Sequence, residues 1–434
     1  METLEGVGDK NLNISCVKVY GLSESNRNLV ETYVQSLYQC KTLNECLGEL
    51  RGICGRLEAL EIGQSFDLDL KKDERGAGTE VEIKIVPHKT LSISTGTEFG
   101  NGDGNLNASI VKRNLFGHAE KFEASTKYGT KTTSSFQFSL SRPVDLFKPE
   151  NRLEFCGYQS LINNLQISSH ESMNRALELK YRFLSSWGQH VLGYCANWRT
   201  IQNVGFNASM KVREQAGDSI KSGIYHHLLN ELWEDPQRPS NGYSLSVKQE
   251  LAGLKGDHRF IKNELSYRSL TEITQNWFIG LGLKLGLLYP LDKYFDKPIQ
   301  PSHLADRFFL GNPTTLRGFR DLGLGDKDKN DVLGGDISWA LGMSLLTPLP
   351  WVNSNKFKGH VFINGGGLKL INNDIKLIDQ IKNVILKPSS TFGLGLIYYH
   401  SIVRLEFNYC LPLSHHSRDF LAPKFQLGFG IDFL

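Results

Sequence analysis

Apolar and polar residues alternate along many short segments of this chain, and this period of two constrains the fold more than any other feature. In Ser134–Pro143, for example, Phe136, Phe138 and Leu140 fall on one face and polar residues lie between them. Because successive side chains of a β-strand point to opposite faces, each such segment predicts a strand with one apolar face. The pattern covers roughly 345 residues from Lys89 onward, which at about 20–22 residues per strand and connection predicts about sixteen strands.

Two mainly β architectures accommodate so many strands. In a soluble β-sandwich the apolar faces point inward, and a domain has about 7–9 strands. In a transmembrane antiparallel β-barrel the apolar faces point to lipid, while charged residues such as Arg404 and Glu406 line a polar interior. The strand number and the alternating terminal segment Phe425–Leu434 favour the barrel. A soluble all-β binding protein remains the alternative.

The first 88 residues differ in pattern and predict a small α/β domain. Ile14–Gly21 has the composition of a strand, and Thr42 with Glu45 forms a T-x-x-E capping pattern at the start of an amphipathic helix. A helix also precedes this one, and two alternating strands follow it. We therefore predict the order β-α-α-β-β for residues 1–88 and the barrel for residues 89–434.

Composition and motifs exclude several functional classes. The net charge is only +3, from 49 basic and 46 acidic residues, so nothing favours a nucleic-acid partner. The seven cysteines contain no CxxC pair, and Asp326–Asp331 (DKDKND) lacks the Gly and Glu of a calcium loop, so we expect a solvated loop there. No nucleophile–base or paired-carboxylate pattern stands out. We expect no metal, no cofactor and no enzymatic activity.

The stretch Pro313–Gly325 (PTTLRGFRDLGLG) places an arginine in a glycine-rich loop among the predicted strands. With this loop, the chain resembles the BamA-type family of outer-membrane barrel insertases, and most of all its mitochondrial branch, the central barrel subunit of the sorting and assembly machinery. VKVYG and the elements after it resemble a POTRA domain, and Thr95–Ser125 resembles the first barrel hairpin. GGDISWALGMSLLTPLP resembles the strand that follows the loop. The loop motif corresponds to Leu316, Arg317, Gly318 and Phe319, and the terminal β-signal to Gln426, Gly428, Ile431 and Phe433.

The resemblance implies that the chain inserts and folds β-barrel precursors into the mitochondrial outer membrane. In the family, the first and last barrel strands separate as a lateral gate, and the client's β-signal adds to the freed edge by β-augmentation. Here the gate would lie between Thr90–Glu98 and Phe425–Leu434. The residues concerned are Thr90, Ser92, Ser94, Thr95 and Gly96 on the first strand, and Gln426, Gly428, Gly430, Ile431 and Phe433 on the last. The alternative for Gly428 and Gly430 is that these glycines only relieve steric crowding inside a narrow barrel.

The resemblance also implies that the loop around residues 313–331 folds into the lumen. Arg317 then needs an acidic partner, because an unpaired guanidinium in a narrow barrel is costly. Relatives carry acids in the two following strands, where this chain has Ser344 and Asn364. Three acids remain as candidates, and the sequence does not choose among them: Asp336, Asp321 and Asp432.

The expected location and partners follow from the same resemblance. The N-terminal residues lack a basic start followed by an apolar stretch, which favours an organelle over a bacterial outer membrane. The N-terminal domain would then face the intermembrane space. The implied partners are barrel precursors, metaxin-like subunits on the cytosolic side and membrane lipid. The alternative function is a passive or polypeptide-conducting channel of the same fold.

Overall fold

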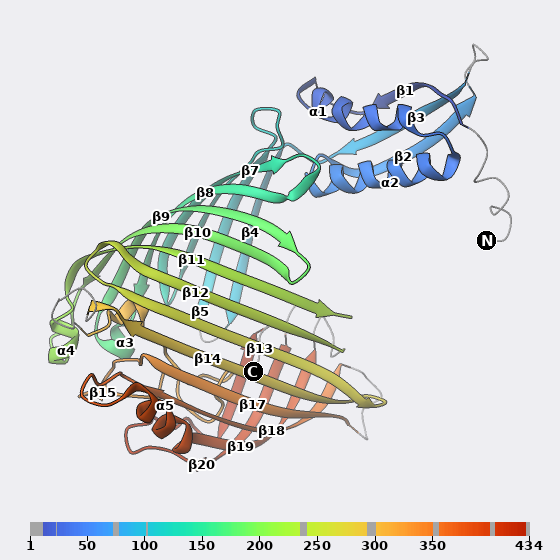
Figure 1. Cartoon of the computed structure of the whole chain (residues 1–434). Coiled ribbons are helices and arrows are strands. Elements are labelled where there is room, and N and C mark those ends of the chain that lie inside the picture. The colour runs from blue at the N-terminus through green and yellow to red at the C-terminus, as the bar shows by residue number, and fades with distance from the viewer. Residues whose placement is uncertain are drawn as a thin grey trace.

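The computed structural model describes residues 12–22, 24–72, 78–100, 103–234, 241–292, 301–349, 356–399 and 404–430. A small α/β domain at the N-terminus precedes one large antiparallel sheet, which curves into a barrel (Figure 1). Among the described residues, no helix is long and apolar enough to cross a membrane.

The N-terminal domain has the predicted order β-α-α-β-β, with one short 3-10 helix between the two α-helices. Its sheet has the order β1-β3-β2, with β1 parallel and β2 antiparallel to β3. The elements are β1 (Ile14–Tyr20), α1 (Glu24–Val34), η1 (Gln35–Gln39), α2 (Leu43–Ala59), β2 (Gly63–Lys72) and β3 (Thr79–Pro87).

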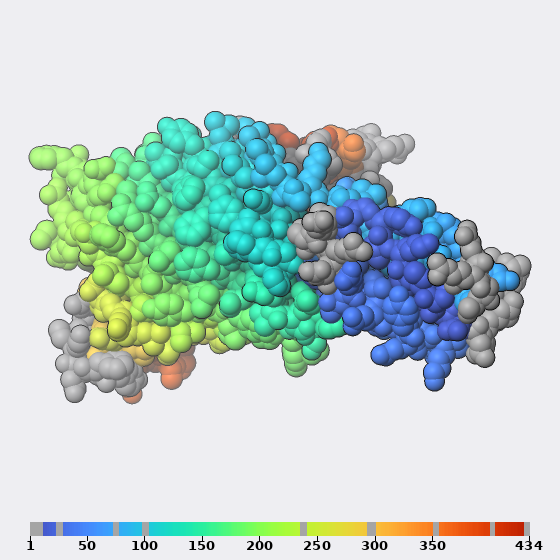
Figure 2. All heavy atoms as spheres, turned by 90° about the horizontal axis from the view of Figure 1, so that it is seen from above, coloured from blue at the N-terminus to red at the C-terminus, as the bar shows by residue number. Residues whose placement is uncertain are grey.

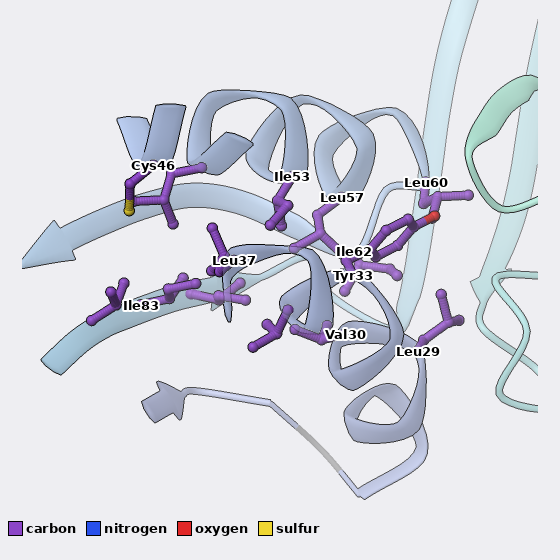
Figure 3. Close-up of a cluster of buried hydrophobic side chains, with 14 of the residues drawn as sticks. Leu29, Val30, Tyr33, Leu37, Cys46, Ile53, Leu57, Leu60, Ile62 and Ile83 are labelled. Carbon is purple, nitrogen blue, oxygen red and sulfur yellow. The ribbon is translucent and has the colours of Figure 1, made fainter. Parts of the chain in front are cut away.

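The core of this domain lies between its helices and its sheet. Val30 and Leu37 from the first helical segments, and Leu57 from α2, are buried against Ile83 of β3 (Figure 3). The predicted capping box is confirmed: the Thr42 hydroxyl accepts a hydrogen bond from the Glu45 amide at 3.3 Å, and the Glu45 carboxylate accepts one from the Thr42 amide at 3.4 Å.

The large sheet has sixteen strands, which confirms the number expected from the alternation. Each strand pairs antiparallel with its sequence neighbours in the sheet. The strands are β4 (Leu91–Gly100), β5 (Asp103–Arg113), β6 (Lys121–Gly129), β7 (Thr132–Asp145), β8 (Lys148–Asn163), β9 (Glu171–Ser185), β10 (Gly188–Gln202), β11 (Gly217–Trp233), β12 (Gly242–Gly256), β13 (Phe260–Thr274), β14 (Trp277–Pro290), β17 (Ile337–Pro348), β18 (Phe357–Lys369), β19 (Ser389–Tyr399), β20 (Arg404–Ser414) and β21 (Phe425–Gly430).

The two faces of the barrel wall have opposite character. On β20, Glu406 and Asn408 are buried on the inner face, whereas Phe407 between them is 57% exposed on the outer face. Large apolar side chains such as Leu177 and Ile279 are exposed in the same way on other strands. Apolar surface of this extent is found where a protein meets lipid or a partner rather than water, which disfavours the soluble alternative.

Connections with structure of their own gather at the end of the barrel away from the N-terminal domain (Figure 1). They include α5, which the search for period two did not predict, and a long segment between β14 and β17 that is described from residue 301 to 336 and is called the lumen loop below. The additional elements are α3 (Leu165–Ser168), α4 (Met210–Arg213), η3 (Leu304–Asp306), β15 (Lys327–Asp328), β16 (Asp331–Val332) and α5 (Leu377–Leu386).

The expectation of a solvated loop at DKDKND is wrong for Asp331. This residue is buried, and its carboxylate accepts hydrogen bonds from the Ser209 amide and the Ser169 hydroxyl, both at 2.6 Å. The cause is a long-range contact with α3 and α4 that the local sequence does not contain. Within the described part of the chain, no group of three or more His, Cys, Asp or Glu side chains is placed to hold a metal ion.

The N-terminal domain packs directly on the other end of the barrel (Figure 2). Glu61 pairs with Arg113 at the end of β5 and with Lys121 at the start of β6, the second at 2.7 Å. The ring of Tyr33 meets the ring of Phe147 edge to face at 5.5 Å between centroids. These charged and aromatic contacts connect the domain to two turns of the barrel.

Glu61 has an unusual backbone for this role. It directly follows the C-cap of α2 with φ of +56°, a left-handed conformation in which glycine is the usual residue. Burial raises the pKa of its carboxyl, but hydrogen bonds and charge from Lys121 and Arg113 outweigh burial and hold the pKa below its usual range. The ion pairs of Glu61 are therefore fully formed above the ordinary pKa of a glutamate. They are lost only as the pH falls through the lowered pKa of Glu61.

We predict that Glu61→Gly and Glu61→Gln both loosen the domain from the barrel. Glycine also relieves the left-handed strain, so Glu61→Gly should leave the domain itself as stable as before, or stabilise it by about 0.5–1 kcal/mol. Hydrogen exchange should then rise in both variants over residues 114–120, the turn between Arg113 and Lys121. Unchanged exchange there would mean that the aromatic contact alone holds the domain.

Candidate functional site

The tip of the lumen loop is fixed by a buried salt bridge to the barrel wall. Arg317 donates from Nε to Glu406 Oε2 at 2.9 Å and from Nη2 to Oε1 at 3.2 Å, which is a two-point pairing. The two side chains are 1% and 0% exposed. The guanidinium also lies over the ring of Phe362, with 5.0 Å between its central carbon and the ring centroid. Arg404 pairs with the same carboxylate.

Glu406 replaces the three acids that the sequence analysis considered as partners of Arg317. Asp321 pairs instead with Lys131, and Asp336 accepts a hydrogen bond from the Ile371 amide at 3.0 Å. Asp432 lies outside the described residues. The alternation of β20 had placed Glu406 on the polar face, but only the folded chain shows that this strand lies against the loop tip.

The two positions where relatives carry acids have other contacts. The Ser344 hydroxyl hydrogen-bonds His360 Nε2 at 3.0 Å. Asn364 contacts the hydroxyl of Thr391, which donates to the Arg317 carbonyl oxygen at 2.6 Å. The wall around the tip is thus polar and hydrogen-bonded at both positions.

Gln426 connects the loop tip to the last strand. Its side-chain oxygen accepts from the Gly318 amide at 2.7 Å, and its side-chain nitrogen donates to the Phe319 carbonyl at 3.0 Å. The segment before β21 also pairs with the tip, because the Ala422 amide donates to the Gly318 carbonyl at 3.0 Å. Two predicted sites, the loop motif and the β-signal, therefore form one site.

Gly318 is required at the tip by its conformation and its surroundings. Its φ is +87°, and an added Cβ would lie 2.5 Å from Thr391 Cγ2. On either side of the Arg317–Gly318 pair, Leu316 and Phe319 are fully buried in a small apolar cluster with Ala340. Apolar packing and the salt bridge thus hold the same few residues.

A second buried ion cluster holds the base of the lumen loop, ahead of the predicted range 313–331. Asp306 pairs with Arg199 of β10 and with Lys221 of β11, the latter at 3.2 Å. Lys221 also pairs with Glu250 of β12 at 2.7 Å. The sequence analysis missed this cluster, since Asp306 stands in no recognisable motif. The loop therefore contacts two different parts of the wall, β10 and β11 at its base and β18–β21 at its tip.

The first and last strands form the seam of the barrel. β4 and β21 stand at the two ends of the hydrogen-bonded strand order, and their Cα atoms approach within 8 Å. Every other neighbouring pair in the sheet has a ladder, whereas none joins β4 to β21 in residues 91–100 and 425–430. Polar groups of β4 point instead toward β5, since Ser92 accepts from Arg113 at 2.9 Å and Ser94 lies 2.7 Å from the Ser109 hydroxyl.

The predicted gate residues lie on both the inner and the outer face of the barrel wall. Alternation on β4 puts Ser92, Ser94 and Gly96 inside, while Thr95 shares the outer face with the 69% exposed Ile93. Thr90 lies just before β4, and its carbonyl accepts from the Arg113 amide at 2.8 Å.

On the last strand, Gly428 stands opposite Glu406, and Gly430 stands opposite Arg404. Both glycines therefore face strand positions that carry the inner charges. Ile431 and Phe433 lie outside the described residues.

We predict that replacing Glu406 destabilises the barrel more than replacing Arg317 does. Glu406→Met takes the carboxylate from the buried guanidinium of Arg317 and from the partly exposed one of Arg404, and we expect it to lower the free energy of unfolding by about 3–5 kcal/mol. Arg317→Met leaves Glu406 with Arg404 and should cost clearly less. The stability of each variant is compared by the temperature at which the folded barrel loses its compact band on SDS gels.

A matched control for the salt bridge is Asp321→Asn, which breaks the partly exposed pair with Lys131 and should change the free energy of unfolding by about 1 kcal/mol or less. Equal losses for Glu406→Met and Arg317→Met would contradict a shared carboxylate.

We also predict that Gln426→Met releases the loop tip from the last strand. The substitution keeps the side-chain length but leaves the Gly318 amide and the Phe319 carbonyl without this partner, at about 1–3 kcal/mol for each group. Hydrogen exchange over residues 316–322 should accelerate, whereas Gln137→Met, at an exposed position on β7, should not change it. Exchange that stays slow would show that the tip is held without Gln426.

Comparison with known proteins agrees with this geometry. The model of the Omp85 superfamily domain matches residues 114–433. A SAM50-like protein of Schizosaccharomyces pombe is 30% identical over 98% of this chain and 91% of its own length, and the human sorting and assembly machinery component 50 homologue is 28% identical over 98% and 91%.

Among solved structures, BamA from Haemophilus ducreyi lacking POTRA domains 1–3 matches 96% of this chain and 84% of that chain. Its TM-score is 0.78 at 15% identity. The fold, the lumen loop and the similarity along nearly the whole chain agree with one another. The chain belongs to the Omp85 superfamily and, within it, to the SAM50-like proteins of the sorting and assembly machinery.

Proposed function

We propose that this chain inserts and folds β-barrel precursor proteins into the mitochondrial outer membrane, and that they enter through the seam between β4 and β21. The barrel spans that membrane, with the N-terminal domain in the intermembrane space and the lumen loop at the cytosolic end. The printed names of the relatives, which refer to sorting and assembly machinery, support a role in assembly. The proposed reaction makes and breaks no covalent bond and needs no cofactor.

The observation that carries the proposal is the missing ladder at the seam. Fifteen pairs of neighbouring strands in the sixteen-strand order have ladders, while β4 and β21 lie side by side without one in their described residues. Unpaired backbone groups are costly in hydrocarbon, so a seam that opens exposes two edges that attract another strand. A precursor strand can satisfy such an edge by β-augmentation, and alternate side chains set its register.

The lumen loop supports a controlled opening rather than a free one. Glu406 of β20 and Gln426 of β21 both hold the tip, so these two strands and the loop form one braced unit. Ser92 and Ser94 connect β4 to the β5 side instead. Opening at the seam therefore separates two internally bonded parts and breaks few of the interactions within either.

The alternative of a passive channel has less support. The lumen loop is attached to the wall at Asp306 near its base and at Arg317 at its tip, so it crosses the interior that a channel needs to keep open. Partners on the cytosolic side, such as metaxin-like subunits, belong to the proposal. The helices and loops at that end offer them a structured surface.

The test is to close the seam with a disulfide and to measure the assembly of a labelled barrel precursor in isolated mitochondria. Ser94→Cys with Gly428→Cys is suitable, because both positions face inward; neighbouring registers can be scanned with position 92 or 96. Thr95 is less suitable, since it faces outward. We expect assembly to stop when the disulfide forms and to recover after reduction.

A matched control places a disulfide between strands that already have a ladder. Ser135 and Ser160 stand opposite each other on β7 and β8, so Ser135→Cys with Ser160→Cys should leave assembly unchanged. If the seam disulfide forms and assembly continues at the same rate, lateral opening is wrong and the channel becomes the better explanation.

A further inference from the structure

Helix α5 lies on the outer face of the barrel wall and does not cover the lumen. The indole Nε1 of Trp339 donates to the Val384 carbonyl at 3.1 Å. An added Cβ at Gly367, which stands opposite Trp339 in the β17–β18 ladder, would lie 2.7 Å from Val384 Cγ1. Both wall positions belong to the outward set of their strands, because Leu341, two residues after Trp339, is 37% exposed while the intervening Ala340 is fully buried.

The position of α5 along the wall is at the loop-bearing end (Figure 1). It packs on β17 and β18 near the last rungs of their ladder, since Ile337–Lys369 is the final pair and Trp339–Gly367 lies only two rungs away. Below it on the same outer face are the exposed apolar residues Met343 and Ile363. A helix in this place is next to the boundary between lipid and water.

The part of α5 that turns away from the wall is apolar. Ile378 is 66% exposed, Ile385 is 53% exposed and Leu386 is 76% exposed. Ile378 and Ile385 are seven residues apart, so with about 100° per residue they lie nearly above one another. This stripe continues around the helix from Leu377 and Ile381, which are partly covered by the wall.

The opposite flank of α5 is polar and faces the loops. Asn383 lines a cavity of about 380 Å³ together with residues of the lumen loop and of the turn before β21, among them Asp326 and Arg418. Gln380 is buried and donates to the Asn372 carbonyl at 2.7 Å. The polar flank thus has protein partners, whereas Ile378, Ile385 and Leu386 are exposed.

Around α5 there are three exposed lysines, Lys376, Lys382 and Lys387, and two exposed aspartates, Asp374 and Asp379. Lys382 lies beside the apolar stripe, because it is about 40° from Ile378 around the helix axis, whereas Lys387 lines the cavity on the polar flank. An amphipathic helix with exposed isoleucine and leucine beside lysines is typical of segments that lie flat in a bilayer surface. Lysine side chains at that depth reach the phosphate groups while their carbon chains stay among apolar groups.

We propose that α5 is a membrane-binding helix that lies in the plane of the bilayer at the loop-bearing end and inserts Ile378, Ile385 and Leu386 among phospholipids. Lys382, which lies beside these residues, favours anionic headgroups. The inference goes beyond precursor insertion and does not depend on whether the seam opens. It assigns to α5 the role of holding the membrane boundary against β17 and β18, the wall beside the anchor of the loop tip.

The first test replaces Ile378 or Ile385 with the photo-crosslinking residue p-benzoylphenylalanine in the full chain in its native membrane. We expect the main adduct, identified by mass spectrometry, to be a phospholipid. An adduct with another protein or with a second copy of this chain would overturn the proposal, and so would the absence of any adduct at both positions.

The second test adds charge to the stripe. In nanodiscs of phosphatidylcholine with phosphatidylinositol, Ile378→Asp combined with Ile385→Asp should accelerate hydrogen exchange over residues 377–386 by roughly tenfold or more, because burial of two isoleucines is lost. Asn383→Asp adds one negative charge, half that of the double variant, to the polar flank of the same helix, and we expect exchange to stay within about twofold of the unmodified chain, since it removes no apolar burial.

An aspartate at position 378 lies in the first turn, where it suits the helix dipole, but one at position 385 lies in the last turn, where it opposes the dipole. Asn383→Asp places a negative charge in that same last turn, so it controls for this effect. The heat stability of the barrel on SDS gels confirms that each variant is folded. Equal exchange in the double variant and the unmodified chain would overturn the proposal, and so would equal acceleration by Asn383→Asp.

Discussion

The salt bridge between Arg317 and Glu406 joins residues 89 positions apart, and the arrangement inside the barrel depends on it. It fixes the tip of the lumen loop on β20, which in turn brings Gly318 and Phe319 to the amide of Gln426 on the last strand. A buried charge pair of this kind gives little net stability, but the loss of one partner is costly. The main effect of the salt bridge is therefore to select one position of the lumen loop, because only there are both charges paired.

The second constraint is hydrocarbon, which leaves no water to satisfy an open strand edge. Fifteen ladders meet this requirement along the sheet, whereas no ladder joins residues 91–100 of β4 to residues 425–430 of β21. The loop tip braces β20 and β21 from inside the barrel, so the weak seam stands beside a well-supported strand pair. The proposed opening at the seam depends on this combination of one edge without a ladder and strong internal attachments.

The two ends of the barrel carry different attachments. At one end, Glu61 and Tyr33 dock the N-terminal domain on turns that follow β5 and β7. At the other, Asp306 attaches the lumen loop to β10 and β11, and α5 packs on the outside of β17 and β18. Ion pairs are used where groups meet inside the protein, while apolar side chains face outward where lipid replaces water.

The alternation of residues determined by itself that the chain forms about sixteen strands with one apolar face, and the capping box located α2, because side-chain direction and helix ends follow from local sequence. Arg317 and Gln426 were also identified, as members of two separate motifs. Only the tertiary structure decided that they share one site, that Glu406 is the partner of Arg317, and that Asp306 holds the base of the loop. Those pairs are separated by 85 to 108 residues, and which of them meet depends on how the closed sheet brings distant strands to the loop.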